Sequence, residues 1–332
     1  MRCFRSLPVF AALSAALLLA AACSKSDGAT SASAPVHGPG TPIPIVHVGW
    51  GSGPDALGHN LPDEGASEGP GGLTVGADGQ VYVLDQLNQR IQRFKPSGTP
   101  NGSIPLPEGV FDDVELDGDA GFVLLDRFQR ASIVYIDLAG AVRKEVTLAG
   151  TGIPEPSLIT AMFLRSDGVW VEVNDSDVIR VANAKGEPDP DRPAVGGRFN
   201  PKGDTVFRQI VADDLQSLTM SKQAVPSGSP LEWAQTTFDG EIGATTGLEI
   251  GAEKVYLSLR VQQLNPSDPA QIISQSHLLV GYGADGKELG RQTFPADTGA
   301  EEVFRPLRLG RDGNLYFIRC TEAGVEIVKV TP

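Results

Sequence analysis

The sequence predicts an all-β protein, a six-bladed β-propeller, from two observations. Along residues 43–332, short apolar strands separated by polar turns recur with a period of about 40 to 50 residues. The repeated units consist of strands alone, which is typical of four-stranded blades that pack on their neighbours in a ring. Two isolated strands cannot bury their apolar faces, so each pair of strands must belong to a larger sheet that packs on its neighbours.

The first unit is the clearest. Residues 71–79, GGLTVGADG, read as an inner strand and a turn, and residues 81–98, VYVLDQLNQRIQRFKPSG, read as two further strands joined by a polar turn. That turn carries Asp85 and Arg90. A carboxylate there can accept turn amide hydrogens while the arginine holds it, so a structural role is predicted for this pair and for its counterpart, Asp126 with Arg130.

The same order of strands and turns recurs five more times. The unit around 208–222 is weaker than the others but falls where the spacing requires one. The turn before each middle strand is predicted at Gly79, Gly121, Gly168, Asp214, Lys254 and Gly313. The long interval before the last turn contains 262–274, QQLNPSDPAQIIS, which is interpreted as an insertion in a turn.

The two ends of the repeat region predict how the ring closes. The last unit stops at Pro332 after three strands, and residues 43–50, IPIVHVGW, form a strand pattern with no blade of their own. We expect this N-terminal strand to be the outer strand of the last blade, because that pairing removes an open sheet edge.

Residues 69–98, GPGGLTVGADGQVYVLDQLNQRIQRFKPSG, resemble an NHL repeat, whose pattern runs from proline through Asp-Gly and Arg-Ile to an aromatic residue and glycine. The second unit keeps Asp126, Arg130 and Ile133, and the third keeps Asp167 and Gly168. The resemblance implies a six-bladed propeller of the broad TolB-like type.

The N-terminus predicts export and lipidation. Arg2 and Arg5 precede an apolar run that ends in AAAC, so residues 1–22 are interpreted as a lipoprotein signal peptide and Cys23 as the lipidated residue. This ending resembles the bacterial lipobox. Residues 23–42 would form a flexible tether and 43–332 the propeller. Ser24 after the cysteine favours the outer membrane, by resemblance to the sorting rule of Gram-negative bacteria, with the protein facing the periplasm or the exterior.

The charge balance limits the partners. The chain has 41 acidic and 27 basic side chains, a formal net charge of −14. Such a surface repels nucleic acid and anionic lipid head groups. The expected partners are the membrane, through the lipid alone, and a protein or peptide; a monomer is expected.

Aligning the inner strands gives one residue per blade at the same register of the channel. These residues are Thr74, Glu115, Phe163, Gln209, Glu249 and Arg308. The candidate ligand-binding residues are Glu115, Gln209, Glu249 and Arg308. Arg308 is expected to neutralise Glu249 in a ring of ion pairs. The alternative is a cation site, with calcium held by Glu115 and Glu249.

Two functional classes remain open. The first is a non-catalytic propeller that binds a protein, a peptide or a small polar ligand in the cell envelope. The second is a metal-dependent propeller hydrolase or lyase, lactonase-like, acting at the channel mouth. No catalytic residue and no metal ligand is assigned, because the histidines of the domain, His47, His59 and His277, are not closely spaced. No cofactor is expected beyond the possible calcium. Binding is preferred over catalysis.

Overall fold

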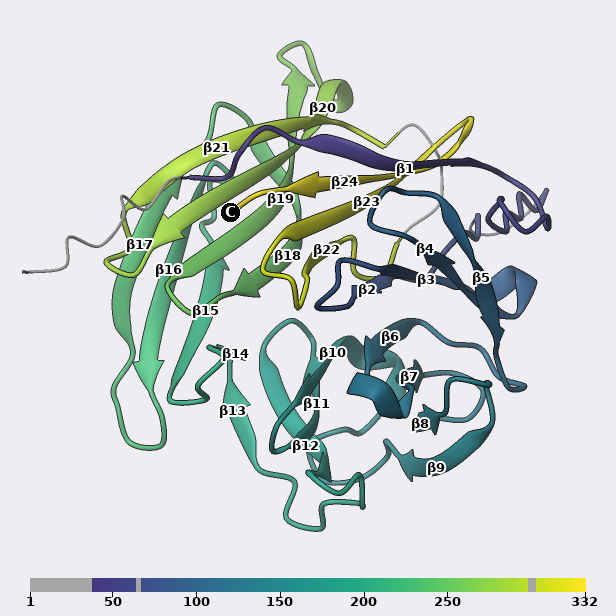
Figure 1. Ribbon diagram of the computed structural model, residues 1–332. Coiled ribbons are helices and arrows are strands. Elements are labelled where there is room, and N and C mark those ends of the chain that lie inside the picture. Colours follow the sequence, from purple (N-terminus) through teal and green to yellow (C-terminus); the bar gives the residue numbers. More distant parts are fainter. Residues whose placement is uncertain (1–37, 64–66, 298–302) are drawn as a thin grey trace, which may run out of the picture. The chain divides into compact units, whose positions relative to one another are not determined.

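The protein is an all-β six-bladed propeller. The structure, a computed structural model, describes residues 38–63, 67–297 and 303–332. The described strands form six four-stranded sheets with antiparallel neighbours, and Figure 1 shows these sheets around a common centre. The predicted signal peptide, Cys23 and most of the predicted tether lie outside the described residues. No helix within the described ranges is long and apolar enough to cross a membrane.

The first three blades follow the chain in order, and each starts with its inner strand. Blade 1 contains β2 (Leu73–Val75), β3 (Val81–Asp85), β4 (Arg90–Phe94) and β5 (Pro100–Pro105). Blade 2 contains β6 (Asp113–Leu116), β7 (Phe122–Asp126), β8 (Ser132–Ile136) and β9 (Val142–Thr147). Blade 3 contains β10 (Ile159–Arg165), β11 (Gly168–Val173), β12 (Asp177–Asn183) and β13 (Ala194–Gly196).

The other three blades complete the ring. Blade 4 contains β14 (Arg198–Phe199), β15 (Thr205–Val211), β16 (Ser217–Ala224) and β17 (Leu231–Thr237). Blade 5 contains β18 (Glu241–Ile250), β19 (Lys254–Asn265), β20 (Asp268–Gly283) and β21 (Glu288–Pro295). Blade 6 contains β22 (Leu307–Leu309), β23 (Leu315–Thr321), β24 (Gly324–Val330) and β1 (Ile43–Gly49). Within the described residues, three short 3-10 helices lie in connections, η1 (Gln86–Asn88), η2 (Gly118–Ala120) and η3 (Pro156–Leu158).

The N-terminal strand closes the ring, as the sequence predicts. β1 pairs antiparallel with β24, and the two lie side by side in Figure 1 although they come from opposite ends of the described chain. A turn of blade 1 packs against β1 at Gly98, where a Cβ atom would lie 1.5 Å from the carbonyl oxygen of Ile45. The contacts begin before the predicted boundary at residue 43, because the Gly40 amide donates to the Thr331 carbonyl oxygen at 2.8 Å.

Two details of the predicted blades are wrong. In blade 4, the inner strand is the two-residue β14, so 208–211 belong to the second strand and the turn at Asp214 follows that strand instead of preceding it. So short an inner strand has no apolar alternation to reveal it. In blade 5, 262–274 does not interrupt the sheet, because β19 and β20 continue through it and pair as far as Asn265 and Asp268.

Five apolar clusters hold neighbouring blades together. Some middle strands are buried on both faces, as in β7 and β11, where every residue is buried. Burial of apolar area is the main stabilising contribution of such interfaces. The clusters join blades 1 and 2 (represented by Leu84 and Leu124), 2 and 3 (Val123, Val171), 4 and 5 (Met220, Leu257), 5 and 6 (Tyr256, Phe317), and 6 and 1 (Ile318, Val83).

Blades 3 and 4 meet through contacts of another kind, which we call the blade 3–4 seam. Arg198 on β14 forms an ion pair with Glu172 on β11, with Nη2 and Oε2 2.6 Å apart. The Trp170 ring meets the Phe199 ring edge-on at a centroid distance of 4.9 Å, and the Arg165 guanidinium lies 4.4 Å from the Phe199 centroid. This seam therefore combines charged and aromatic side chains.

The two turn aspartates have structural contacts. Asp85 accepts hydrogen bonds from the Arg90 Nε at 2.7 Å and from the Gly58 amide at 2.8 Å. Asp126 accepts from the Arg130 amide at 3.0 Å, but the Arg130 guanidinium pairs with Glu145 instead, at 2.9 Å. The predicted Asp126–Arg130 ion pair is therefore wrong, although the carboxylate does organise its turn.

Candidate functional site

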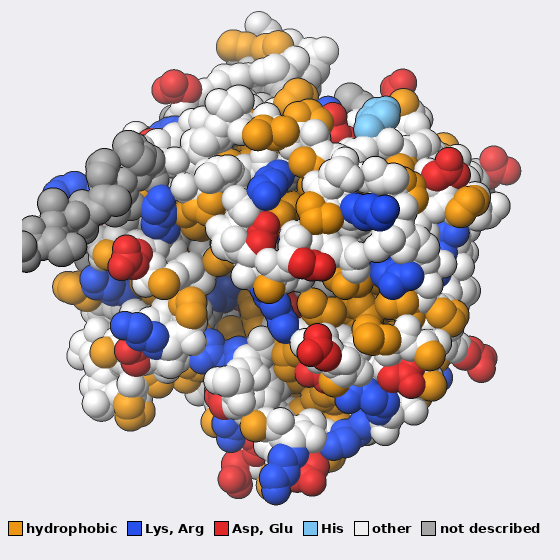
Figure 2. All heavy atoms as spheres, viewed as in Figure 1, with side chains coloured by type: hydrophobic (Ala, Val, Ile, Leu, Met, Phe, Trp, Pro, Cys, Tyr) orange, Lys and Arg blue, Asp and Glu red, His pale blue; other side chains and the backbone are white. Residues whose placement is uncertain are grey.

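A cavity of about 390 Å³ lies at one end of the central channel. It is lined by residues of all six inner strands and of the turns beside them. Figure 2 shows a hollow near the middle of the drawn face with lysine or arginine side chains beside it. The charged residues of the lining are Glu115, Arg165, Arg198, Glu249, Arg305, Arg308 and Arg311. The apolar wall includes Phe163, Leu164, Phe199, Leu248, Ile250 and Leu309.

Arg308 on β22 anchors one side of the floor. Its Nη1 donates to Glu115 Oε1 at 2.7 Å, and its Nη2 donates to the Val114 carbonyl oxygen at 3.0 Å and also to Asp113. Arg308 is only 4% exposed and Asp113 is fully buried. Such charges are tolerated in the interior only when they are paired and hydrogen-bonded, so blades 2 and 6 are joined here by charge.

Arg305, two residues before β22, spans the channel. Its Nη2 donates to Glu249 Oε1 at 2.9 Å, and its Nη1 lies 3.3 Å from Asp113 Oδ2 and 3.5 Å from Glu115 Oε1. Burial alone would lower the pKa of Arg305, but attraction by Asp113, Glu249 and Glu115 outweighs burial and raises it. A permanently charged guanidinium therefore connects carboxylates of blades 2 and 5.

Burial raises the pKa of Glu115, although attraction by Arg308 and Arg305 opposes this shift. Its neighbour Asp113 and the more distant Glu249 raise the pKa further through repulsion between like charges. Glu115 thus holds its proton to a higher pH than an exposed glutamate. The cavity floor becomes more positive whenever Glu115 is protonated, since the arginines stay charged.

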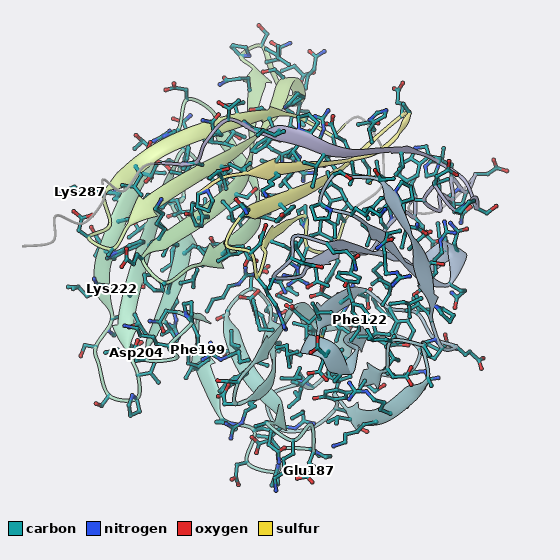
Figure 3. The ribbon with its side chains drawn as sticks, in the orientation of Figure 1. Phe122, Glu187, Phe199, Asp204, Lys222 and Lys287 are labelled. Atoms are coloured by element: carbon teal, nitrogen blue, oxygen red, sulfur yellow. The ribbon has the colours of Figure 1, made fainter. Side chains whose placement is uncertain are left out.

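The rim of the cavity carries Arg165 and Arg311. The Arg165 guanidinium reaches Asp167 at 3.3 Å and the Asn200 carbonyl oxygen at 3.2 Å while it covers the Phe199 ring. In Figure 3, Phe199 lies nearer the centre of the ring than the labelled Asp204 and Lys222 of the same blade.

Arg311 lies in the turn after β22 and donates to the Leu116 carbonyl oxygen. No described carboxylate forms an ion pair with Arg311, and the buried Nε of Arg308 has no hydrogen-bond partner among the described residues. Both residues line the cavity, but the Arg308 Nε itself is buried. The Arg311 guanidinium therefore offers donors to an acceptor-bearing ligand.

The structure brings three of the four predicted site residues together. Glu115, Glu249 and Arg308 line the cavity. Gln209 does not, because β14 takes the inner position of its blade and Gln209 lies on β15. It lines two smaller cavities, of about 170 and 60 Å³, and its buried Oε1 has no partner among the described residues.

The ion pairs that the structure forms among these residues differ from the predicted ones. Arg308 was expected to neutralise Glu249, but it pairs with Glu115 and Asp113, and Arg305 takes Glu249. Arg305, Asp113 and Arg198 were missed. A possible signal for Arg305 is the FRPLRL segment, in which two arginines three residues apart flank the start of a strand that is otherwise apolar.

A calcium ion in this cavity would need Glu115 and Glu249 as ligands. Glu115 and Glu249 both contact Arg305, so a divalent ion between the two carboxylates would meet a fixed positive charge. Within the part of the chain that the structure describes, no cluster of three or more histidine, cysteine or carboxylate side chains could hold a metal.

Comparison with known proteins extends only to the fold. No family model and no curated protein matches the chain. Similar solved structures include a member of the duf4221 family from Bacteroides vulgatus, with 11% identity, a TM-score of 0.49, and coverage of 87% of this chain and 98% of that chain. Virginiamycin B lyase from Staphylococcus aureus has 15% identity, a TM-score of 0.40, and coverage of 80% and 95%. Regucalcin, a calcium-binding protein from Agrobacterium tumefaciens, has 13% identity, a TM-score of 0.44, and coverage of 79% and 90%.

Proposed function

We propose that this protein is a non-catalytic binding propeller of the bacterial cell envelope, and that a small polar ligand or part of a peptide enters the cavity at the end of its channel. The observation that carries the proposal is the pairing of an arginine-rich floor and rim with an apolar wall. Ligand sites of this kind are concave and mostly apolar, with a few fixed polar groups that orient the ligand.

The arginines of the floor are held in place before any ligand arrives. Arg305 and Arg308 are each bonded to two or more carboxylates, and both are buried. Their rotamers are therefore fixed, which lowers the entropy lost on binding. Arg311 also lines the cavity and its guanidinium has no ion-pair partner among the described residues, so a carboxylate or another acceptor group is the chemistry that fits best.

Anchorage is the second part of the proposal. Lipidation of Cys23 would hold the propeller at the outer membrane, whereas the protein itself, with a formal net charge of −14 over the whole chain, is repelled by anionic lipid. Changing Cys23→Ser is expected to abolish incorporation of an alkyne-labelled fatty acid and to move the protein from the membrane fraction to the soluble fraction. Unchanged labelling would refute the anchor.

The ligand-binding part can be tested without knowing the natural ligand. Ligand-observed NMR with a panel of small carboxylates, amines and neutral sugars should detect at least one binder. Ser166 is an exposed rim residue, so Ser166→Trp should obstruct the cavity and abolish that signal. Ser97→Trp is the matched control, because Ser97 is an exposed turn residue of blade 1 that does not line the cavity. A panel without binders, or equal signals from both variants, would contradict the proposal.

One observation favours the catalytic alternative. Glu115 has a raised pKa and lies in a cavity beside arginines, an arrangement found in general acids. The proposal of binding alone predicts that mass spectrometry recovers any bound panel compound unchanged after long incubation. Turnover that disappears in Glu115→Gln would place a hydrolase or lyase ahead of a binding protein.

A further inference from the structure

The channel cavity adjoins a second hollow between blades 2 and 3. This second hollow has a volume of about 570 Å³ and shares Leu164, Arg165, Ser166 and Arg311 with the channel cavity. Because the two hollows share four lining residues, they lie next to each other. A ligand long enough to pass the shared residues would contact both hollows.

Basic side chains dominate the second hollow, which we call the basic groove. Its charged lining residues are Arg143, Lys144, Arg165, Lys185, Arg311 and Asp117. The one carboxylate, Asp117, is bonded to Arg143 at 2.7 Å. Arg165 is also paired, with Asp167 at the groove edge. The groove therefore has more cations than its own carboxylates can neutralise.

Three of these cations have no ion-pair partner among residues 38–63, 67–297 and 303–332. Lys144 Nζ donates to the Lys185 carbonyl oxygen at 2.7 Å, and Arg311 donates to a backbone carbonyl, but no described carboxylate lies within ion-pair distance of Lys144, Lys185 or Arg311. The chain as a whole is strongly acidic. A concave basic surface on such a protein focuses the electrostatic potential and draws an anionic group to one place.

We propose that the natural ligand is an acidic peptide segment that places one apolar side chain in the channel cavity and its carboxylates along the basic groove. This inference deepens the proposed function and rests on it. Phe163, Leu248 and Leu309 would surround the apolar side chain, whereas Lys144, Lys185 and Arg311 would face the carboxylates.

The combination of surfaces favours a peptide over a uniform polyanion. An apolar wall beside a line of cations matches a chain whose side chains alternate in character, as those of a peptide do. A long phosphate polymer would gain nothing from Phe163 or Leu248, and its ends would meet the acidic surface outside the groove. A short acidic segment avoids that repulsion.

The test uses fluorescence anisotropy with the folded, unlipidated protein and a labelled hexapeptide of one phenylalanine followed by glutamates. The matched peptide has glutamine at every glutamate position. We expect the acidic peptide to bind about tenfold more tightly than the glutamine peptide, with an affinity that falls as salt is added. Lys144→Glu and Lys185→Glu should each weaken the acidic peptide about fivefold.

Lys95→Glu is the matched control, because Lys95 is exposed, lines neither hollow and gives the same change in net charge. Equal binding of both peptides, or equal losses from Lys95→Glu and Lys185→Glu, would overturn the inference. Inorganic polyphosphate that displaces the peptide and binds with similar affinity would assign the groove to a phosphate polymer, which also overturns it. If panel compounds bind and depend on Ser166 while the peptide does not bind, only this inference fails. If nothing binds, the proposed function fails too.

Discussion

The interface between blades 2 and 3 and the blade 3–4 seam hold blade 3 in different ways. Towards blade 2, its side chains join a buried apolar cluster that includes Val123, Val171 and Ile179. Towards blade 4, Glu172 on the same strand as Val171 pairs with Arg198, and Phe199 packs on Trp170 and Arg165. One strand thus takes part in both kinds of contact.

This difference indicates how the stability of each interface should respond when a contact is removed. Apolar contact is non-directional, roughly proportional to buried area, and independent of protonation. A buried ion pair contributes little net stability when it is complete, but removing one partner leaves an uncompensated charge in the interior. We therefore expect the apolar interfaces to lose stability in proportion to what is removed, and the seam to lose it abruptly.

The largest effect should come from removing a whole strand of an apolar interface. A chain that begins at Gly51 lacks β1, including the buried Val46 and Val48, and leaves the edge of β24 unpaired. Its free energy of unfolding should fall by about 5 kcal/mol, measured by urea denaturation. A chain that begins at Ile43 keeps β1 and is the control. An unchanged midpoint for the shorter chain would mean that β1 does not close the ring.

At the seam, Arg198→Met should lower the free energy of unfolding by about 4 kcal/mol, because it leaves the Glu172 carboxylate buried without its ion-pair partner. The double change of Arg198→Met with Glu172→Met should recover much of that loss, since no charge is then left unpaired. A double variant that is less stable than Arg198→Met alone would contradict this account of the seam.

On the other side of blade 3, Val171→Ala should cost about 2 kcal/mol, because it removes methyl groups from a fully buried cluster and leaves a small cavity. The same denaturation measurement at several pH values should give the same loss. A loss that varied with pH would show that the apolar interface and the seam are coupled.

The smallest effect is the pH dependence contributed by single glutamates. Burial would raise the pKa of Glu172, but attraction and hydrogen bonding by Arg198 and a hydrogen bond from Thr160 outweigh burial, so the pKa lies below its ordinary value of 4.5. The stability that Glu172 contributes is present above pH 4.5 and is lost as the pH falls through the lowered pKa. Glu172→Gln should therefore make the acid side of the stability profile shallower.

Glu115 should change the stability with pH in the opposite direction to Glu172, and the same experiment measures both. Because its folded-state pKa is raised, the folded protein binds the proton more tightly than the unfolded chain, and stability falls as the pH rises from 4.5 through the raised pKa. Glu115→Gln should remove this fall. Urea denaturation between about pH 3 and 8 would measure both profiles, and parallel changes in the two variants would contradict the assignment of the shifts.

Much of the fold could be predicted because its signals are local. The alternation of apolar residues in 71–98, the glycine turns and the unmatched strand at 43–50 indicate the blades and their closure without knowledge of distant contacts. Asp85 and Arg90 could be paired for the same reason, since five residues and one turn separate them. Blade 4 was misassigned where that local signal is missing, in the two residues of β14.

The sequence by itself therefore determined the fold class, the strand that closes the ring and the channel position of Glu115, Glu249 and Arg308. Only the tertiary structure decided which charges meet. Arg308 contacts Glu115 from 193 residues away, and Arg305 reaches Glu249 on the neighbouring blade. Strand periodicity specifies which way a side chain points, but the reach of a long arginine depends on how the closed ring is packed, and many pairings satisfy the same pattern.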